Sequence, residues 1–278
     1  MSGREREQGP SAGAPLAPGL LPRTAQPTQW VEFHALTEIG AVRETHEDAI
    51  VIGGTMAAAS GAQIAGSGWI PPGGMVFAVT DGMGGYAGGA AAAGVVAVGM
   101  VGAAGGAAPG EWAPWLERLS DRVAAAGGAW GTPDMGATAV VLVIRPGRFE
   151  VVNVGDCRAY LVADGAVTQL SVDDRITTAR GEAVTQSLGG PSRPLDPHLV
   201  DMPAPEAGAR LILCSDGLFG AIPRAELHAL LARPGGAHEV ASALAEAAYR
   251  HQSRDNFSLA VLAIGEAGAD QERGELLP

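Results

Sequence analysis

The alternation of apolar and polar residues predicts a chain built mainly of short strands, with a few helices between them. Residues 30–40 alternate as a half-buried strand does, and 75–80 and 209–214 are apolar runs that lead into an Asp followed by Gly. Further strands are expected at 48–54, 137–144, 149–154, 157–163 and 256–264. Apolar residues at helical spacing predict helices at 87–104, 111–130, 223–232 and 237–250. The Gly-, Ala- and Pro-rich residues 53–74 are expected to form a loop.

The order of these elements predicts an antiparallel α+β sandwich, because strands follow strands and helices come in pairs. One domain is expected over residues 29–265. The Pro-, Gly- and Ala-rich residues 1–28 are interpreted as a disordered N-terminal arm, and 266–278 as a loose C-terminal tail. The uncharged helix at 87–104 is so rich in Ala and Gly that it is expected to be buried rather than to cross a membrane.

Composition narrows the classes of partner. A net charge of −12, from 18 basic and 30 acidic residues, argues against binding to nucleic acid or to an anionic membrane surface. The two cysteines, Cys157 and Cys214, lie in apolar strand patterns and are expected to be reduced and buried. No signal-peptide pattern is visible, so a cytoplasmic protein is expected.

Acidic residues recur where strands meet loops. They are Glu47 and Asp48 in "HED", Asp81 in "TDG", Asp156 in "VGDC", Asp216 in "SDG" and Asp255 in "RDN". Carboxylates brought together from distant strand ends repel one another unless cations neutralise them, and Mg²⁺ and Mn²⁺ prefer oxygen ligands. This pattern indicates a metal-dependent hydrolase. Any one Asp after a strand could instead be a turn former or helix cap.

Seven segments occur in the order found in one known family. They are "RETHEDA", "FAVTDGMGGYAGG", "MGATAVVLVI", "VVNVGDCRAYLV", "TQSLGG", "LILCSDGLFG" and "RDNFSLAVL". From about Val31 to Ile264 the chain resembles the metal-dependent Ser/Thr protein phosphatases of type 2C, in their bacterial form. The resemblance implies a four-layer α-β-β-α sandwich, in which two antiparallel sheets are flanked by helices and metals bind in a cleft at one end.

The resemblance also implies roles for individual residues. Asp81 is expected to bridge two Mn²⁺ or Mg²⁺ ions, with Asp216 and Asp255 on one ion and Asp48 and Glu47 near the other. Glu47 is equally compatible with an indirect role. The backbone carbonyl of Gly82 would be a ligand, and Asp156 would hold a third ion together with Asp216. Arg43 would bind the substrate phosphate.

The implied function is hydrolysis of phosphoserine and phosphothreonine through a metal-activated water at a binuclear Mn/Mg centre. Its partners would be phosphorylated proteins, the substrates of Ser/Thr kinases, and a monomer is expected. Two alternatives stay open: a pseudophosphatase that binds phosphoproteins without turnover, and a phosphoesterase for small molecules.

Three departures from the family pattern stand out. His46 stands where Asn is usual and is interpreted as structural, and Tyr86 stands where His is usual. The segment between Asp174 and Thr185 is too short for the helical flap that relatives carry beside the active site. The cleft is therefore expected to be open on that side, with an exposed third metal site.

Overall fold

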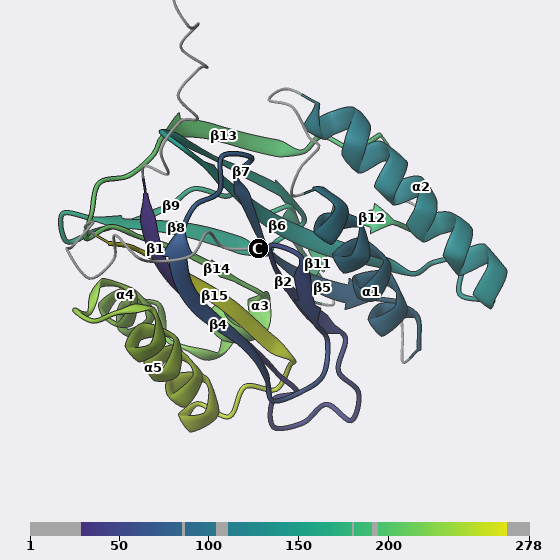
Figure 1. Cartoon of the computed structure of the whole chain (residues 1–278). Helices are drawn as coiled ribbons and strands as arrows, with labels where there is room; N and C mark the ends of the chain where they lie inside the picture. The colour runs from purple at the N-terminus through teal and green to yellow at the C-terminus, as the bar shows by residue number, and fades with distance from the viewer. Residues whose placement is uncertain (1–28, 85–86, 104–110, 180, 191–193, 266–278) are drawn as a thin grey trace, which may run out of the picture.

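The structure of the protein is a computed structural model that describes residues 29–84, 87–103, 111–179, 181–190 and 194–265. The expectations for the arm at 1–28, the tail at 266–278 and Tyr86 lie outside the described residues. Two antiparallel sheets face each other, and helices cover both outer faces (Figure 1). The expected four-layer α-β-β-α sandwich is confirmed.

The first sheet has six strands. In spatial order they are β4 (Ala62–Trp69), β1 (Trp30–Glu38), β15 (Phe257–Gly265), β14 (Arg210–Cys214), β8 (Arg158–Ala163) and β9 (Ala166–Gln169). The second sheet has seven strands: β13 (His198–Pro203), β7 (Arg148–Val154), β6 (Gly136–Arg145), β5 (Met75–Met83), β2 (Asp48–Ile52) and β3 (Thr55–Ala57), with β12 (Leu188–Gly189) paired to β6. A separate two-stranded hairpin joins β10 (Arg175–Thr178) and β11 (Gly181–Val184).

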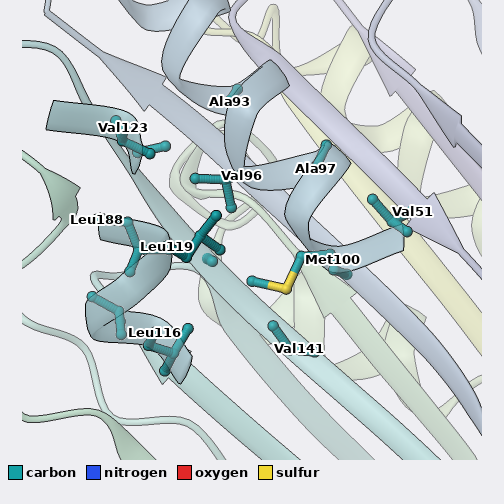
Figure 2. Close-up of a cluster of buried hydrophobic side chains, with 14 of the residues drawn as sticks. Val51, Ala93, Val96, Ala97, Met100, Leu116, Leu119, Val123, Val141 and Leu188 are labelled. Atoms are coloured by element: carbon teal, nitrogen blue, oxygen red, sulfur yellow. The ribbon is translucent and has the colours of Figure 1, made fainter. Parts of the chain in front are cut away.

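The helices pack in two groups on opposite sides of the sheets (Figure 1). Helices α1 (Ala87–Ala103) and α2 (Trp112–Trp130) cover the seven-stranded sheet, while α3 (Asp216–Ala221), α4 (Arg224–Ala232) and α5 (Ala237–Arg250) cover the six-stranded sheet. In Figure 2, Val96 and Met100 of α1 lie against Leu119 of α2 and Val141 of the sheet. The helix expected at 87–104 is thus a buried core helix. No helix of the described ranges is long and apolar enough to cross a membrane.

Strand parity explains where polar residues collect. Along β1, Val31, Phe33 and Ala35 face the apolar layer between the two sheets, and the next position of that parity is Thr37. Along β5, Phe77 and Val79 face the same layer, and the next position is Asp81. Because side chains alternate between the faces of a strand, the inward face changes from apolar to polar at one end of the sandwich.

One expectation about the fold is wrong. Residues 53–74 are not simply a loop, because they contain β3 and the eight-residue edge strand β4. Strand β4 is held by pairing with β1, from Trp30 opposite Trp69 to Thr37 opposite Ala62. Its small and glycine-rich sequence carries little apolar alternation of its own, so tertiary pairing decides its conformation. Both cysteines, in contrast, are buried and unpaired as expected.

Candidate metal centre

Six acidic residues line one cleft at the polar end of the sandwich, one of which, Glu44, was not expected from the sequence. The cleft has a volume of about 700 Å³. The acidic residues expected from the sequence that line it are Glu47, Asp81, Asp156, Asp216 and Asp255. Arg43 lines the same cleft, as do Gly82 and Thr138. The structure therefore brings together residues from five separate parts of the chain.

The position of one further carboxylate, Asp48, is set by strand pairing. Asp48 opens β2 and lies directly opposite Asp81 of β5 in the antiparallel register. Its side chain is only 1% exposed, so it lies behind the cleft rather than in its lining. Both oxygens of the carboxylate are therefore surrounded by protein, and Oδ2 accepts hydrogen bonds from the hydroxyls of Ser215 and Ser258, at 2.8 Å each.

Crowding and burial disfavour the charged form of these carboxyl groups. Burial, opposed by the hydrogen bonds from Ser258 and Ser215, raises the pKa of Asp48 to about 7. Burial and the neighbouring Asp156 and Asp255 raise the pKa of Asp216 to about 6. Asp81, at the centre of the group, has its pKa raised well above the ordinary value by burial and then by Asp48 and Asp216. A cation bound among them would reverse these shifts.

Gly82 gives the backbone access to the cleft. A Cβ at this position would lie 2.0 Å from the carbonyl oxygen of Gly89 and 2.8 Å from that of Glu47. The Gly82 amide donates to the Glu47 carbonyl at 3.0 Å, which ties the end of β5 to the loop before β2. Only glycine fits where helix α1 approaches so closely.

Asn256 holds the loop that carries Arg43 and Glu47, a role that was not expected from the sequence. Its Oδ1 accepts from the Glu47 amide at 2.8 Å, and its Nδ2 donates to the carbonyls of Ile39 and Thr45 at 2.9 and 3.0 Å. The only signal available was its place after Asp255. Three such bonds to one buried amide fix the spacing between the two acidic segments.

Arg43 lies at the mouth of the cleft with 46% of its side chain exposed. Its Nη2 is 2.6 Å from Oδ2 of Asp255, and Nη1 is 3.9 Å from Oε2 of Glu47. The hydrogen bond with Asp255 is the largest influence that raises its pKa. A guanidinium carries five N–H donors, so these two contacts leave others for an anion in the cleft.

The expectation that Asp156 would be exposed is wrong, and a third metal site there stays a prediction. Asp156 is 3% exposed, and Nη2 of Arg175 lies 3.0 Å from its Oδ2. Arg175 belongs to the β10–β11 hairpin and also contacts Glu182 at 2.6 Å. The described residues between Asp174 and Thr185 form this hairpin and contain no helix, as expected. The hairpin thus contacts Asp156 through Arg175.

Two other acidic residues near the cleft are held by side-chain and backbone contacts. Asp173 accepts three hydrogen bonds from Arg158. Asp174 accepts from the Gly155 amide at 2.8 Å and is 2.8 Å from Nε2 of His198. These contacts fix the turn that carries Asp156.

The donor atoms suit a hard divalent cation. The titratable ligands that line the cleft are carboxylates, and oxygen-rich sets favour Mg²⁺ and Mn²⁺ over zinc. Oε1 of Glu47, Oδ1 of Asp48 and Oδ1 of Asp216 are buried with no partner among the described residues. No three His, Cys, Asp or Glu side chains of the described residues yet lie close enough together to grip one ion. The residues fit such ions in chemistry and burial, and the side chains would have to move closer together to bind one.

Comparison with known proteins agrees with this geometry. The family model described as protein phosphatase 2C matches residues 62–256. The serine/threonine protein phosphatase PstP of Mycobacterium tuberculosis is 27% identical over 91% of this chain and 48% of its own length. The serine/threonine phosphatase stp of Listeria innocua is 25% identical over 45% of this chain and 55% of its own length. The chain thus spans about half the length of these curated relatives.

Solved structures share the fold. The catalytic domain of PstP in complex with two manganese ions matches with a TM-score of 0.67 and 25% identity, over 86% of this chain and all of that one. The serine/threonine phosphatase of S. agalactiae matches with a TM-score of 0.70 and 22% identity, over 85% of this chain. Since the family model covers well over half of the sequence, the chain belongs to the protein phosphatase 2C family.

Proposed function

We propose that the protein is a metal-dependent phosphoprotein phosphatase that hydrolyses phosphoserine and phosphothreonine at a binuclear Mn²⁺ or Mg²⁺ centre. The observation that carries the proposal is the group of crowded carboxylates whose pKa values are raised, at the floor of an open cleft. Such a group is stabilised when cations bind it. The two manganese ions of the PstP catalytic domain support the same number here.

The residues would divide the work as follows. Asp81 would bridge the two ions, Asp216 and Asp255 would complete one site, and Asp48, Glu47 and the Gly82 carbonyl would serve the other. When bound, two such ions supply a nucleophilic water at neutral pH and positive charge against the phosphate oxygens. The protein itself supplies the fixed carboxylates and a water-filled cleft open to a large substrate.

Arg43 would orient the substrate phosphate from the mouth of the cleft. Its contact with Asp255 places a guanidinium beside the proposed metal ligands, where it can donate to phosphate oxygens while it stays paired. The substrates would be phosphorylated proteins. That the protein is a cytoplasmic monomer stays a prediction from the sequence.

The test is turnover of a phosphothreonine peptide and of p-nitrophenyl phosphate, each with Mn²⁺ and with excess EDTA. We expect turnover of both only with metal, and loss of turnover in Asp81→Asn and Asp216→Asn. Asp201→Asn is the matched control, because Asp201 of the edge strand β13 pairs with Arg148 of the neighbouring strand β7, and neither residue lines the cleft.

Each alternative predicts a different result in this assay. A pseudophosphatase would bind the phosphopeptide without releasing phosphate in any metal. A phosphoesterase for small molecules would hydrolyse p-nitrophenyl phosphate and leave the peptide intact. Full turnover in EDTA would exclude the proposed metal centre.

A further inference from the structure

A chain of buried hydrogen bonds runs from His46 to the carboxylate of Asp48. Nε2 of His46 is 2.7 Å from Oγ1 of Thr37, which is 2.6 Å from Oγ of Ser258. Oγ of Ser258 is 2.8 Å from Oδ2 of Asp48. Oγ of Ser215 reaches the same oxygen of Asp48 at 2.8 Å. Thr37, Ser215 and Ser258 are all fully buried.

Strand register creates this chain. Thr37 of β1 lies opposite Ser258 of β15, and both side chains have the parity that faces the layer between the sheets. Asp48 opens β2 in the facing sheet. The hydrogen bonds therefore cross from one sheet to the other at the polar end of the core, where a buried hydroxyl needs a partner.

When Asp48 is ionised, the number of hydroxyl protons allows only one direction of donation along these hydrogen bonds. A carboxylate can only accept, so Ser258 gives its single hydroxyl proton to Asp48. Ser258 must then accept from Thr37, whose own proton is used in that bond. Thr37 can therefore only accept from His46, which must carry a proton on Nε2. Ser215 also donates to Asp48, and its oxygen accepts from the Ser258 amide at 2.9 Å.

The backbone on both sides of His46 is fixed, so the ring is held in place. The Thr45 carbonyl accepts from Asn256, and the Glu47 amide donates to the same side chain. Nδ1 of His46 is buried and has no partner among the described residues, whereas Nε2 makes the contact with Thr37. A ring that only filled space would not need this contact between Nε2 and a buried hydroxyl.

We propose that His46 is a positioning residue for the metal centre: it donates from Nε2–H to Thr37 and, through Thr37 and Ser258, orients the carboxylate of Asp48 towards the ions. The proposal rests on the proposed function, because it gives Asp48 a place at the metals. Side chains that hydrogen-bond to a metal ligand hold it in its orientation, and their loss weakens metal binding. The alternative is that His46 only packs against its neighbours before β2 and does not affect the metal centre.

The first test locates the proton directly and needs no metal. Long-range ¹H–¹⁵N correlation spectra of the full chain, recorded in EDTA at about pH 8 where a histidine is neutral, show which ring nitrogen of His46 is protonated. We expect the Nε2–H tautomer in EDTA and with Mg²⁺. A ring protonated on Nδ1 alone could not donate to Thr37 and would overturn the proposal, whatever the activity of the protein.

The second test measures the dissociation constant of Mn²⁺ by calorimetry. We expect His46→Ala to weaken binding about tenfold or more, the usual effect of losing a partner behind a ligand. His46→Gln keeps an N–H₂ donor of similar reach and should bind Mn²⁺ close to wild type. His228→Ala, on the outer helix α4, is the matched control and should leave the constant unchanged.

Thr37→Val removes the next hydrogen bond in the same chain. The double variant with His46→Ala should therefore bind Mn²⁺ no more weakly than either single variant. Additive losses would mean that the two residues act separately and would overturn the proposal. If Thr37→Val fails to fold, the tautomer of the wild-type ring still decides the question. If the wild-type protein bound no Mn²⁺, the proposed function would be contradicted. If wild type and His46→Ala bound Mn²⁺ equally well, only the role of His46 would be contradicted.

Discussion

The carboxylate of Asp48 shows how a single residue is held in an unfavourable state for a purpose. A charged group that is 1% exposed is costly to bury, and two hydroxyl donors offset only part of that cost. The pKa of Asp48 therefore rises to about 7 despite these bonds. If Asp48 holds a cation as proposed, binding would offset this cost, and the ion and the folded protein would stabilise each other.

This shift predicts how the stability of the metal-free protein depends on pH. In the folded chain the pKa of Asp48 is about 7, against an ordinary value of about 3.9. The folded state thus binds the proton more tightly, and the contribution is complete below about pH 4 and lost as pH rises through about 7. In EDTA we expect Asp48→Asn to gain stability over wild type at pH 8, and clearly less at pH 5, where folded Asp48 is protonated but the unfolded chain is already mostly ionised. Thermal unfolding at both pH values measures the difference.

The same comparison in Mn²⁺ supplies the control. Because Asp48→Asn lacks a carboxylate near the ions, added Mn²⁺ should stabilise wild type more than the variant, and more at pH 8 than at pH 5 where protons compete. Parallel stability curves for the two proteins in EDTA would show that Asp48 keeps its ordinary pKa.

Gly82 makes a second prediction at the scale of one residue. In Gly82→Ala the new Cβ would lie 2.0 Å from a backbone oxygen of α1, so the helix or the strand must shift. We expect a loss of about 1–3 kcal/mol in the free energy of unfolding, together with weaker Mn²⁺ binding. Gly128→Ala in α2 is the control, since nothing lies within 4 Å of its Cβ; it should stabilise the chain by up to about 1 kcal/mol. Urea titrations with calorimetry measure both effects, and a Gly82→Ala protein as stable as wild type would contradict the close packing.

At the scale of elements, the β10–β11 hairpin is tied to the domain by Arg175. Two four-residue strands are too short to be stable alone, and most of the hairpin side chains are exposed. Arg175 joins it to the domain through Asp156, and its guanidinium lies 5.4 Å from the centre of the Phe219 ring. Backbone hydrogen bonds at the base of the hairpin, from Thr185 to Asp174 and from Asp174 to Gly155, add to this side-chain contact.

Arg175→Ala should loosen the hairpin and destabilise the metal-free protein. Without Arg175 the Asp156 carboxylate would be buried with no positive charge beside it, and we expect this to lower the free energy of unfolding by about 2 kcal/mol. This is less than the cost of breaking a fully buried pair, because Arg175 keeps some exposure. Hydrogen exchange of residues 175–184 should accelerate, and urea titration in EDTA measures the loss. Glu182→Ala is the matched control, because Glu182 is more than half exposed and contributes under about 1 kcal/mol. Equal exchange in wild type and Arg175→Ala would show that something else holds the hairpin.

The elements that could be predicted from the sequence are those with a strong apolar signal. The strands at 75–83 and 210–214 and the helices α1, α2, α4 and α5 appear within a residue or a few of their expected bounds. The edge strands β4 and β13 were missed because half of each faces solvent and their partners come from far along the chain. Weakly patterned edge strands form through pairing, which local sequence does not reveal.

At the scale of the whole molecule, the acidic residues of the candidate site were visible in the sequence but their supports were not. Asp81 and Asp216 could be found because each follows an apolar strand and precedes a glycine. Ser258 and Ser215 are ordinary serines in sequence, and they reach Asp48 across 210 and 167 residues. Only the register of two sheets brings them together, so the hydrogen bonds that tune the site had to come from the structure.

The shape of the cleft leads to a prediction about substrate choice. Beyond the acidic residues and Arg43, the side chains that line it are Val42, Thr45, Met83, Thr138 and Val184. A protein substrate would thus find little surface to hold it outside the phosphorylated residue, and contacts remote from the reacting centre are what discriminate between substrates. We expect kcat/KM for phosphothreonine and phosphoserine peptides with varied flanks to span less than about a hundredfold, equivalent to about 2.7 kcal/mol of transition-state binding. A wider spread that persists in Arg175→Ala would place recognition on a surface outside the cleft, whereas one that collapses in that variant would assign it to the hairpin.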